Sequence, residues 1–138
     1  MNIVQNTKKQ NGKGILNMNI VSKMLEIQNQ IKIYHWQTYG YAEHQTFGSL
    51  YGSLTDSIDD FIEVFMGKYG RINANGTFAI TLQNYKSSSP VQAIDTFITY
   101  LIVELPTLLD PVKDSDLLNI RDEILGDLNK TKYLLTLK

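Results

Sequence analysis

The stretch NIVSKMLEIQNQIKIYHWQT, residues 19–38, decides how the chain folds. Its apolar residues recur every three or four positions, at Ile20, Met24, Ile27, Ile31 and Tyr34. This spacing places them along one face of an α-helix that buries this face against other helices. A glycine break follows directly, so we expect the first helix to end near residue 38.

A long irregular link separates the second helix from the third. An apolar stripe with helical spacing runs through residues 42–69, whereas residues 70–88 have no helical period and are rich in turn-forming residues. A link of this length is unusual in a compact domain unless it connects two distant points, for example the opposite ends of a helix. The sequence therefore predicts an all-α fold, a four-helix bundle with a long crossover between the second and third helices.

Capping residues mark the last two helices. Ser89 is a good N-cap and Pro90 fits the first helical position, so we expect the third helix to begin there. Pro106 should kink or end it, and the fourth helix begins around Ser115. The bundle thus occupies residues 15–138 as one domain.

Residues 1–14 are polar and read as a flexible N-terminal arm. The arm carries Lys8, Lys9 and Lys13 and no acidic residue. Three lysines supply only a few counterion-release contacts, and the formal net charge of the chain is −1. We expect weak, non-specific DNA binding at most.

Composition excludes several classes of function. The chain has no cysteine, which rules out disulfides, thiolate zinc sites, iron–sulfur clusters and cysteine nucleophiles. No secretory signal or membrane-spanning run is recognisable, so we expect a cytoplasmic protein without a membrane role. Lysine and asparagine have AT-rich codons, which points to a low-GC bacterium or a virus. A viral protein would reside in the host cytoplasm or the virion.

Two histidines and two carboxylates form the candidate metal site. His35 and His44 flank the expected turn between the first two helices, whereas Asp59 and Glu63 lie four residues apart on one face of the second helix. Histidine and carboxylate together suit iron, manganese or zinc. Trp36, beside the first histidine, we interpret as a packing residue, because indole does not bind these metals.

Helix geometry separates the two halves of this site. In a continuous helix His44 and Asp59 are roughly 22 Å apart, at about 1.5 Å per residue, so one ion cannot reach both within one chain. A second copy, packed antiparallel about a two-fold axis, would bring the histidines of one chain over the carboxylates of the other. Gly48 and Gly52 fit such close helix packing.

This pattern resembles the Dps-type miniferritins. The likeness lies in His35-Trp36, a second histidine at His44, and the pair Asp59 and Glu63 beyond it. It implies a ferritin-like four-helix bundle and a ferroxidase centre at the interface of a dimer, with His35 and His44 from one subunit and Asp59 and Glu63 from its partner. It also implies a closed dodecamer. Gly48 stands where the family usually has an acid, and the interval between the histidines is about one helical turn shorter.

The resemblance leaves two functions open. In the first, the protein binds iron(II), as one or two ions, and oxidises it with peroxide or oxygen, with iron storage and oxidative protection as the result. In the second, it is a catalytically degenerate ferritin-like structural or virion-associated protein of a phage or virus. The missing acid at position 48 favours the second function, and the full set of four ligands favours the first.

Overall fold

The computed structural model describes the backbone of residues 3–138 and the side chains from Met18 onward. The described part is all-helical and contains no β-strand, which confirms the predicted all-α class. Its α-helices are α1 (Ile3–Gln37), α2 (Tyr41–Tyr69), α3 (Ser89–Thr99) and α4 (Ser115–Leu134). A π-helix, η1 (Tyr100–Glu104), and a 3-10 helix, η2 (Leu105–Leu108), continue α3.

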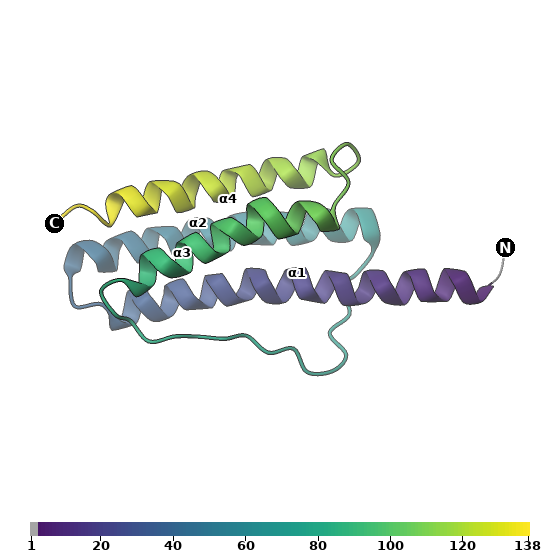
Figure 1. The fold of residues 1–138 in the computed structure, drawn as a ribbon, viewed down its shortest axis with the longest axis horizontal. Helices are drawn as coiled ribbons and strands as arrows, with labels where there is room; N and C mark the ends of the chain where they lie inside the picture. The colour runs from purple at the N-terminus through teal and green to yellow at the C-terminus, as the bar shows by residue number, and fades with distance from the viewer. Residues whose placement is uncertain (1–2) are drawn as a thin grey trace.

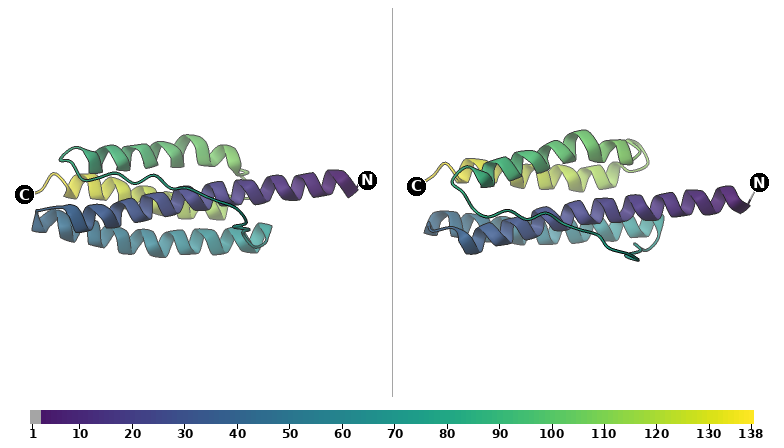
Figure 2. Two further views of the ribbon diagram at one scale, coloured as in Figure 1. Left: turned by 90° about the horizontal axis from the view of Figure 1, so that it is seen from below. Right: turned by 60° about the horizontal axis from the view of Figure 1, so that its bottom comes forward.

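The four helices pack in two layers. Figure 2 shows α1 and α2 in one layer and α3 with α4 in the other. The helices α2 and α3 run in the same direction, because the link after α2 returns along the length of the bundle before α3 begins (Figure 1). This arrangement confirms the long crossover that the sequence predicts for residues 70–88.

The core is a continuous apolar layer between the helices. Fully buried residues come from every α-helix and from the helical turns after α3: Met24, Ile31, Tyr34, Phe47, Leu54, Phe61, Ile94, Leu101, Leu105, Leu117, Ile124 and Leu128. They include most of the stripe that the sequence predicts for the first helix. Burial of such side chains contributes about 1.5–3 kcal/mol each, which makes this layer the main source of stability.

Side chains of α1 hold the crossover in an extended conformation. The backbone N–H groups of residues 81, 83 and 85 donate to side-chain oxygens of Glu26, Gln30 and Gln37, at 2.7–2.8 Å. Gln30 also donates its amide N–H to the carbonyl oxygen of Gln83, at 2.9 Å. The Gln30 side chain therefore makes the same two backbone hydrogen bonds to Gln83 that a neighbouring β-strand would make. As a result, the crossover follows α1 without forming a sheet.

Pro106 explains the irregular end of α3. Proline lacks an N–H and its ring excludes the carbonyl four residues earlier, so a regular α-helix cannot continue through it. The chain responds with a π-helical turn, in which the Leu105 N–H donates to the Tyr100 carbonyl oxygen, and then with a 3-10 turn that contains Pro106. Within the described chain, Ser89–Leu108 is the stretch long and apolar enough to cross a membrane by length and composition, with 28% of it buried.

The helix α1 begins earlier than expected. It is continuous from Ile3, so the backbone of residues 3–14 is helical where the sequence predicts an arm without helical period. These first turns project beyond the other helices (Figure 1), which explains why they carry no apolar stripe. Their side chains, with the three lysines of the arm, lie outside the described part, and DNA binding by the arm remains a prediction.

Candidate functional site

The two histidines pair with each other across the turn between α1 and α2. Their rings stack with centroids 3.9 Å apart and planes inclined by 20°. His35 Nδ1 lies 2.8 Å from the carbonyl oxygen of His44, and His44 Nδ1 lies 2.9 Å from the carbonyl oxygen of His35. The two histidines flank the turn that the sequence predicts, and the structure shows that this turn brings them into contact. We call this pair, with the turn at Gly40, the histidine turn.

The hydrogen bonds of the histidine turn fix how each ring can be used. A carbonyl oxygen only accepts, so each Nδ1 carries the proton that it donates. A neutral ring in this tautomer presents Nε2 as a free lone pair. Metal-binding histidines have this arrangement, with the second ring nitrogen donating to a carbonyl or carboxylate. The donor set of His35 and His44 therefore fits a divalent metal.

Gly48 makes room for the histidine turn. A Cβ atom built at this position would lie 3.1 Å from Cε1 and 3.2 Å from Nδ1 of His35. Any other residue would therefore press on the imidazole, which the hydrogen bond to His44 holds in place. The predicted close approach at Gly48 is thus a contact with α1 of the same chain. At Gly52 nothing lies within 4 Å, so this glycine leaves open space on the surface of α2.

Glu43 is the acid nearest to the histidines in sequence. Its Oε2 accepts hydrogen bonds from the Thr38 hydroxyl at 2.6 Å and from the Tyr85 hydroxyl at 2.7 Å. The bond to Glu43 and burial raise the pKa of Tyr85 above its ordinary value. Glu43 therefore connects the turn to the end of the crossover. This carboxylate has a structural task already, which limits its use as a replacement for the acid absent at position 48.

The carboxylates form a second cluster on the exposed face of α2. Oxygen atoms of Asp59, Asp60 and Glu63 all lie within 4.8 Å of one another, and all three residues are exposed in the single chain. The predicted pairing of Asp59 with Glu63 on one face is correct. Asp60 is a third member of the cluster that the sequence-based prediction did not include, although its spacing of three from Glu63 already permits the contact.

The histidine turn and the carboxylate cluster lie apart on α2. His44 and Asp59 belong to one uninterrupted helix, so about 22 Å separates them along its axis. The cluster is exposed in the single chain, so the expected site would need a second copy to bring its histidines over these carboxylates. Trp36, expected to pack, is 66% exposed instead, and the Lys32 ammonium lies 5.4 Å from its ring centroid. Trp36 lies on the side of α1 that faces away from the core. The core-facing side of α1 is already occupied by the stripe of buried residues.

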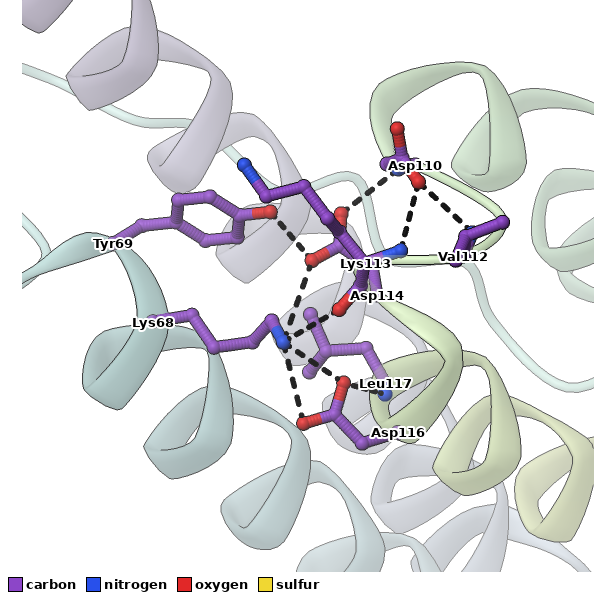
Figure 3. A network of polar contacts seen from close by, with 8 residues as sticks. All are labelled: Lys68, Tyr69, Asp110, Val112, Lys113, Asp114, Asp116 and Leu117. Carbon is purple, nitrogen blue, oxygen red and sulfur yellow. Dashed lines mark hydrogen bonds and ion pairs between the residues drawn. The ribbon is translucent and has the colours of Figure 1, made fainter.

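A network of charged residues joins the far end of α2 to the loop before α4 (Figure 3). We call it the aspartate junction: Lys68, Tyr69, Asp110, Asp114 and Asp116. Asp114 is 1% exposed, and its carboxylate accepts hydrogen bonds from the Tyr69 hydroxyl and from the Asp110 N–H. The Lys68 ammonium donates to the carbonyl oxygen of Lys113 at 2.7 Å and pairs with Asp116 at 3.1 Å.

The charged groups of the aspartate junction are paired with one another and with nearby backbone groups. The hydrogen bond to Asp114, together with burial and nearby negative charge, raises the pKa of Tyr69 to about 12. Backbone N–H groups of Lys113 and Val112 lower the pKa of Asp110, and the hydrogen bond from Lys68 lowers that of Asp116. Both oxygens of the buried Asp114 carboxylate have donors of their own. We therefore interpret the junction as a structural connection.

Comparison with known protein families shows which family the chain belongs to. Residues 35–135 match a family model described as a family of unknown function (DUF5856). The chain belongs to this family. The matched region starts at His35 and contains all four predicted ligands as well as the aspartate junction. Neither a curated protein nor a solved structure matches the chain.

Proposed function

We propose that this member of the DUF5856 family is a ferritin-like subunit that binds iron(II) and oxidises it at a site shared by two copies. The observation that carries the proposal is the histidine turn, in which both Nδ1 atoms donate to carbonyls and both Nε2 atoms are left for a metal. The carboxylates of Asp59, Asp60 and Glu63 supply the hard oxygen ligands that complete such a site.

The helix order supports a ferritin-like bundle. The helices α2 and α3 are parallel and joined by a crossover that spans the bundle (Figure 1). One long crossover of this kind distinguishes ferritin-like bundles from simple up-and-down ones. The core of the described chain is apolar, and its one buried carboxylate, that of Asp114, belongs to the aspartate junction. The proposed site therefore lies at an interface and not inside the bundle.

A two-fold dimer brings the two halves of the site together. The pairs of ligands lie toward opposite ends of α2, with the exposed Gly52 between them. Antiparallel packing of two α1–α2 faces about an axis near this glycine places each carboxylate cluster opposite the partner's histidines. Each dimer then has two equivalent sites. A closed shell of twelve chains, as in the miniferritins, is the larger assembly that we propose.

The chemistry requires neutral and anionic ligands in one place. Neutral imidazoles hold the iron without added charge, and the carboxylates favour the higher charge of iron(III) over iron(II). Two iron(II) ions each give up one electron to a peroxide, which takes up two protons and leaves as two molecules of water. Iron is the substrate here, and zinc or manganese would occupy the same ligands without this reaction.

Iron(II) oxidation by peroxide tests the proposal. We expect Glu63→Gln to lower the initial rate more than tenfold, because the variant removes a ligand and keeps the shape of the side chain. Glu123→Gln, at an exposed acid on α4, is the matched control and should oxidise iron(II) at the rate of the unaltered chain. Light scattering of both variants should give a dimer or a larger assembly. A monomer, or equal rates in the two variants, contradicts the proposal.

A structural role is the second candidate, and one observation favours it. The histidine rings stack on each other and are hydrogen-bonded within one chain, so they stabilise the turn without any metal. A ferritin-like structural or virion-associated protein needs no more than this. Zinc titration distinguishes the two functions, because the structural role predicts no saturable binding and the iron-binding role predicts binding that His44→Ala removes. Cytoplasmic location and weak DNA binding through the arm belong to both proposals.

A further inference from the structure

A groove lies between α1, the crossover and α3, on a face separate from the histidine turn. It has two adjoining cavities of about 270 and 290 Å³. Lys23, Glu26 and Tyr100 line both cavities and so mark the middle of the groove. The crossover forms one wall, because the Thr81 N–H donates to Glu26 and keeps the link in place over the gap.

Tyr100 has an unusual position in this groove. Its side chain is 6% exposed, and its hydroxyl is a buried polar atom without a hydrogen-bond partner in the described chain. A buried hydroxyl without a partner costs about 1–3 kcal/mol, so native proteins almost always provide one. Burial and the negative charge of Glu104 raise the pKa of Tyr100, so the phenol stays neutral, and its oxygen can accept a hydrogen bond from a cationic donor. A ligand with an acceptor or donor atom would satisfy it.

The π-helical turn sets the lining of the second cavity. Tyr100 is the first residue of this turn and Glu104 the last, and both line the same cavity together with Asn19 and Ser22 of α1. The wider turn exists because Pro106 prevents a regular helix at this point. Turns of this kind inside helices are found frequently at functional sites.

The charges in the groove favour a cation. Two carboxylates, Glu26 and Glu104, line it with one ammonium group, that of Lys23. Lys23 pairs with Glu26 at 3.5 Å and also lies 5.9 Å from the centroid of the Tyr100 ring. Glu104 has no cationic partner among the described side chains. One negative charge beside an unsatisfied hydroxyl and an aromatic ring is an environment suited to an organic ammonium ion.

We propose that this groove binds a small aliphatic amine or diamine, with its ammonium group between Glu104 and the Tyr100 hydroxyl. The aliphatic part of the ligand lies against Leu108 and the methyl group of Ala79, which line the same cavity. A second ammonium group of a diamine reaches the polar side chains of the first cavity, among them Gln92. This site is independent of the proposed iron chemistry and does not depend on a second copy of the chain.

Calorimetric titration of the full chain with 1,4-diaminobutane tests this proposal. We expect one saturable site per chain, binding at least tenfold weaker in Glu104→Gln, and a smaller loss in Tyr100→Phe. Glu123→Gln, an exposed acid on α4, is the matched control and should bind like the unaltered chain. Succinate, a dianion of similar length, should not bind.

Three results would overturn the proposal: no saturable binding of the diamine, the same affinity in Glu104→Gln as in the unaltered chain, or equal binding of succinate. Tyr100 is buried, so its variant can alter folding, and thermal unfolding of Tyr100→Phe is measured alongside the titration. Glu104 is exposed, and its variant therefore tests the site without this complication.

Discussion

The two ends of α2 are secured in different ways. At the histidine turn, two rings exchange hydrogen bonds with each other's backbone carbonyls across a short connection. At the aspartate junction, Lys68 and Tyr69 meet aspartates more than forty residues later in the chain. The first connection uses one nitrogen of each ring and leaves the other available. In the second connection the charged groups bind one another, and for this reason the proposed chemistry is assigned to the histidine turn and not to the aspartate junction.

The largest effect should follow from Asp114→Ala at the aspartate junction. The change removes the acceptor for the Tyr69 hydroxyl and the Asp110 N–H and leaves Lys68 without its buried partner. We expect a loss of about 3 kcal/mol in the free energy of unfolding, measured by urea denaturation. Asp56→Ala, at an exposed aspartate of α2, is the control and should change stability by no more than about 0.5 kcal/mol. Similar losses in the two variants would remove the contrast between the ends of α2.

A double-mutant cycle measures the histidine turn. His35→Ala and His44→Ala should each lower stability by about 1–2 kcal/mol, because each removes one hydrogen bond and the whole stacking interaction between the two rings. The double variant should lose less than the sum, by about 0.5–1.5 kcal/mol, the usual value for a pair of stacked aromatic rings. Additive losses would mean that the rings act independently.

Replacement of Gly48 tests the fit around His35. Gly48→Ala gains about 1 kcal/mol of helix propensity, yet the new methyl group lies 3.1 Å from the imidazole. We expect a net loss of about 1 kcal/mol, as is common when a tight site is overpacked. Gly126→Ala on α4, with nothing within 4 Å, should instead gain about 0.5–1 kcal/mol. In the His35→Ala background Gly48→Ala should become stabilising, and a loss that persists there would point to another contact.

The smallest effect concerns acid titration at the aspartate junction. The pKa values of Asp110 and Asp116 are lowered below their ordinary 3.8, so these carboxylates stabilise the fold above that pH. This contribution is lost as the pH falls through the lowered values. In Lys68→Met, NMR titration should find the pKa of Asp116 restored toward 3.8, with Asp110 still low, because backbone N–H groups act on Asp110. Equal shifts of both residues would contradict this assignment.

Local patterns in the sequence predicted the helices well, with errors at their ends. The second helix was expected at residues 42–69 and runs from Tyr41 to Tyr69. The expected N-cap at Ser89 was wrong: Ser88 is the N-cap, and the Ser89 hydroxyl exchanges hydrogen bonds with the backbone of Lys86. Two neighbouring serines offer the same capping chemistry, and only the path of the crossover decides between them.

The sequence by itself determined the helices, the break at Gly40, the irregular crossover and the spacing of Asp59 and Glu63, because helical hydrogen bonds close within four residues and their periodicity is local. Only the tertiary structure decided the ring stack of His35 on His44, the contact at Gly48 and the burial of Asp114. Each of these depends on the distance between different helices. That distance is set by the packing of the whole core, and no local pattern of residues specifies it.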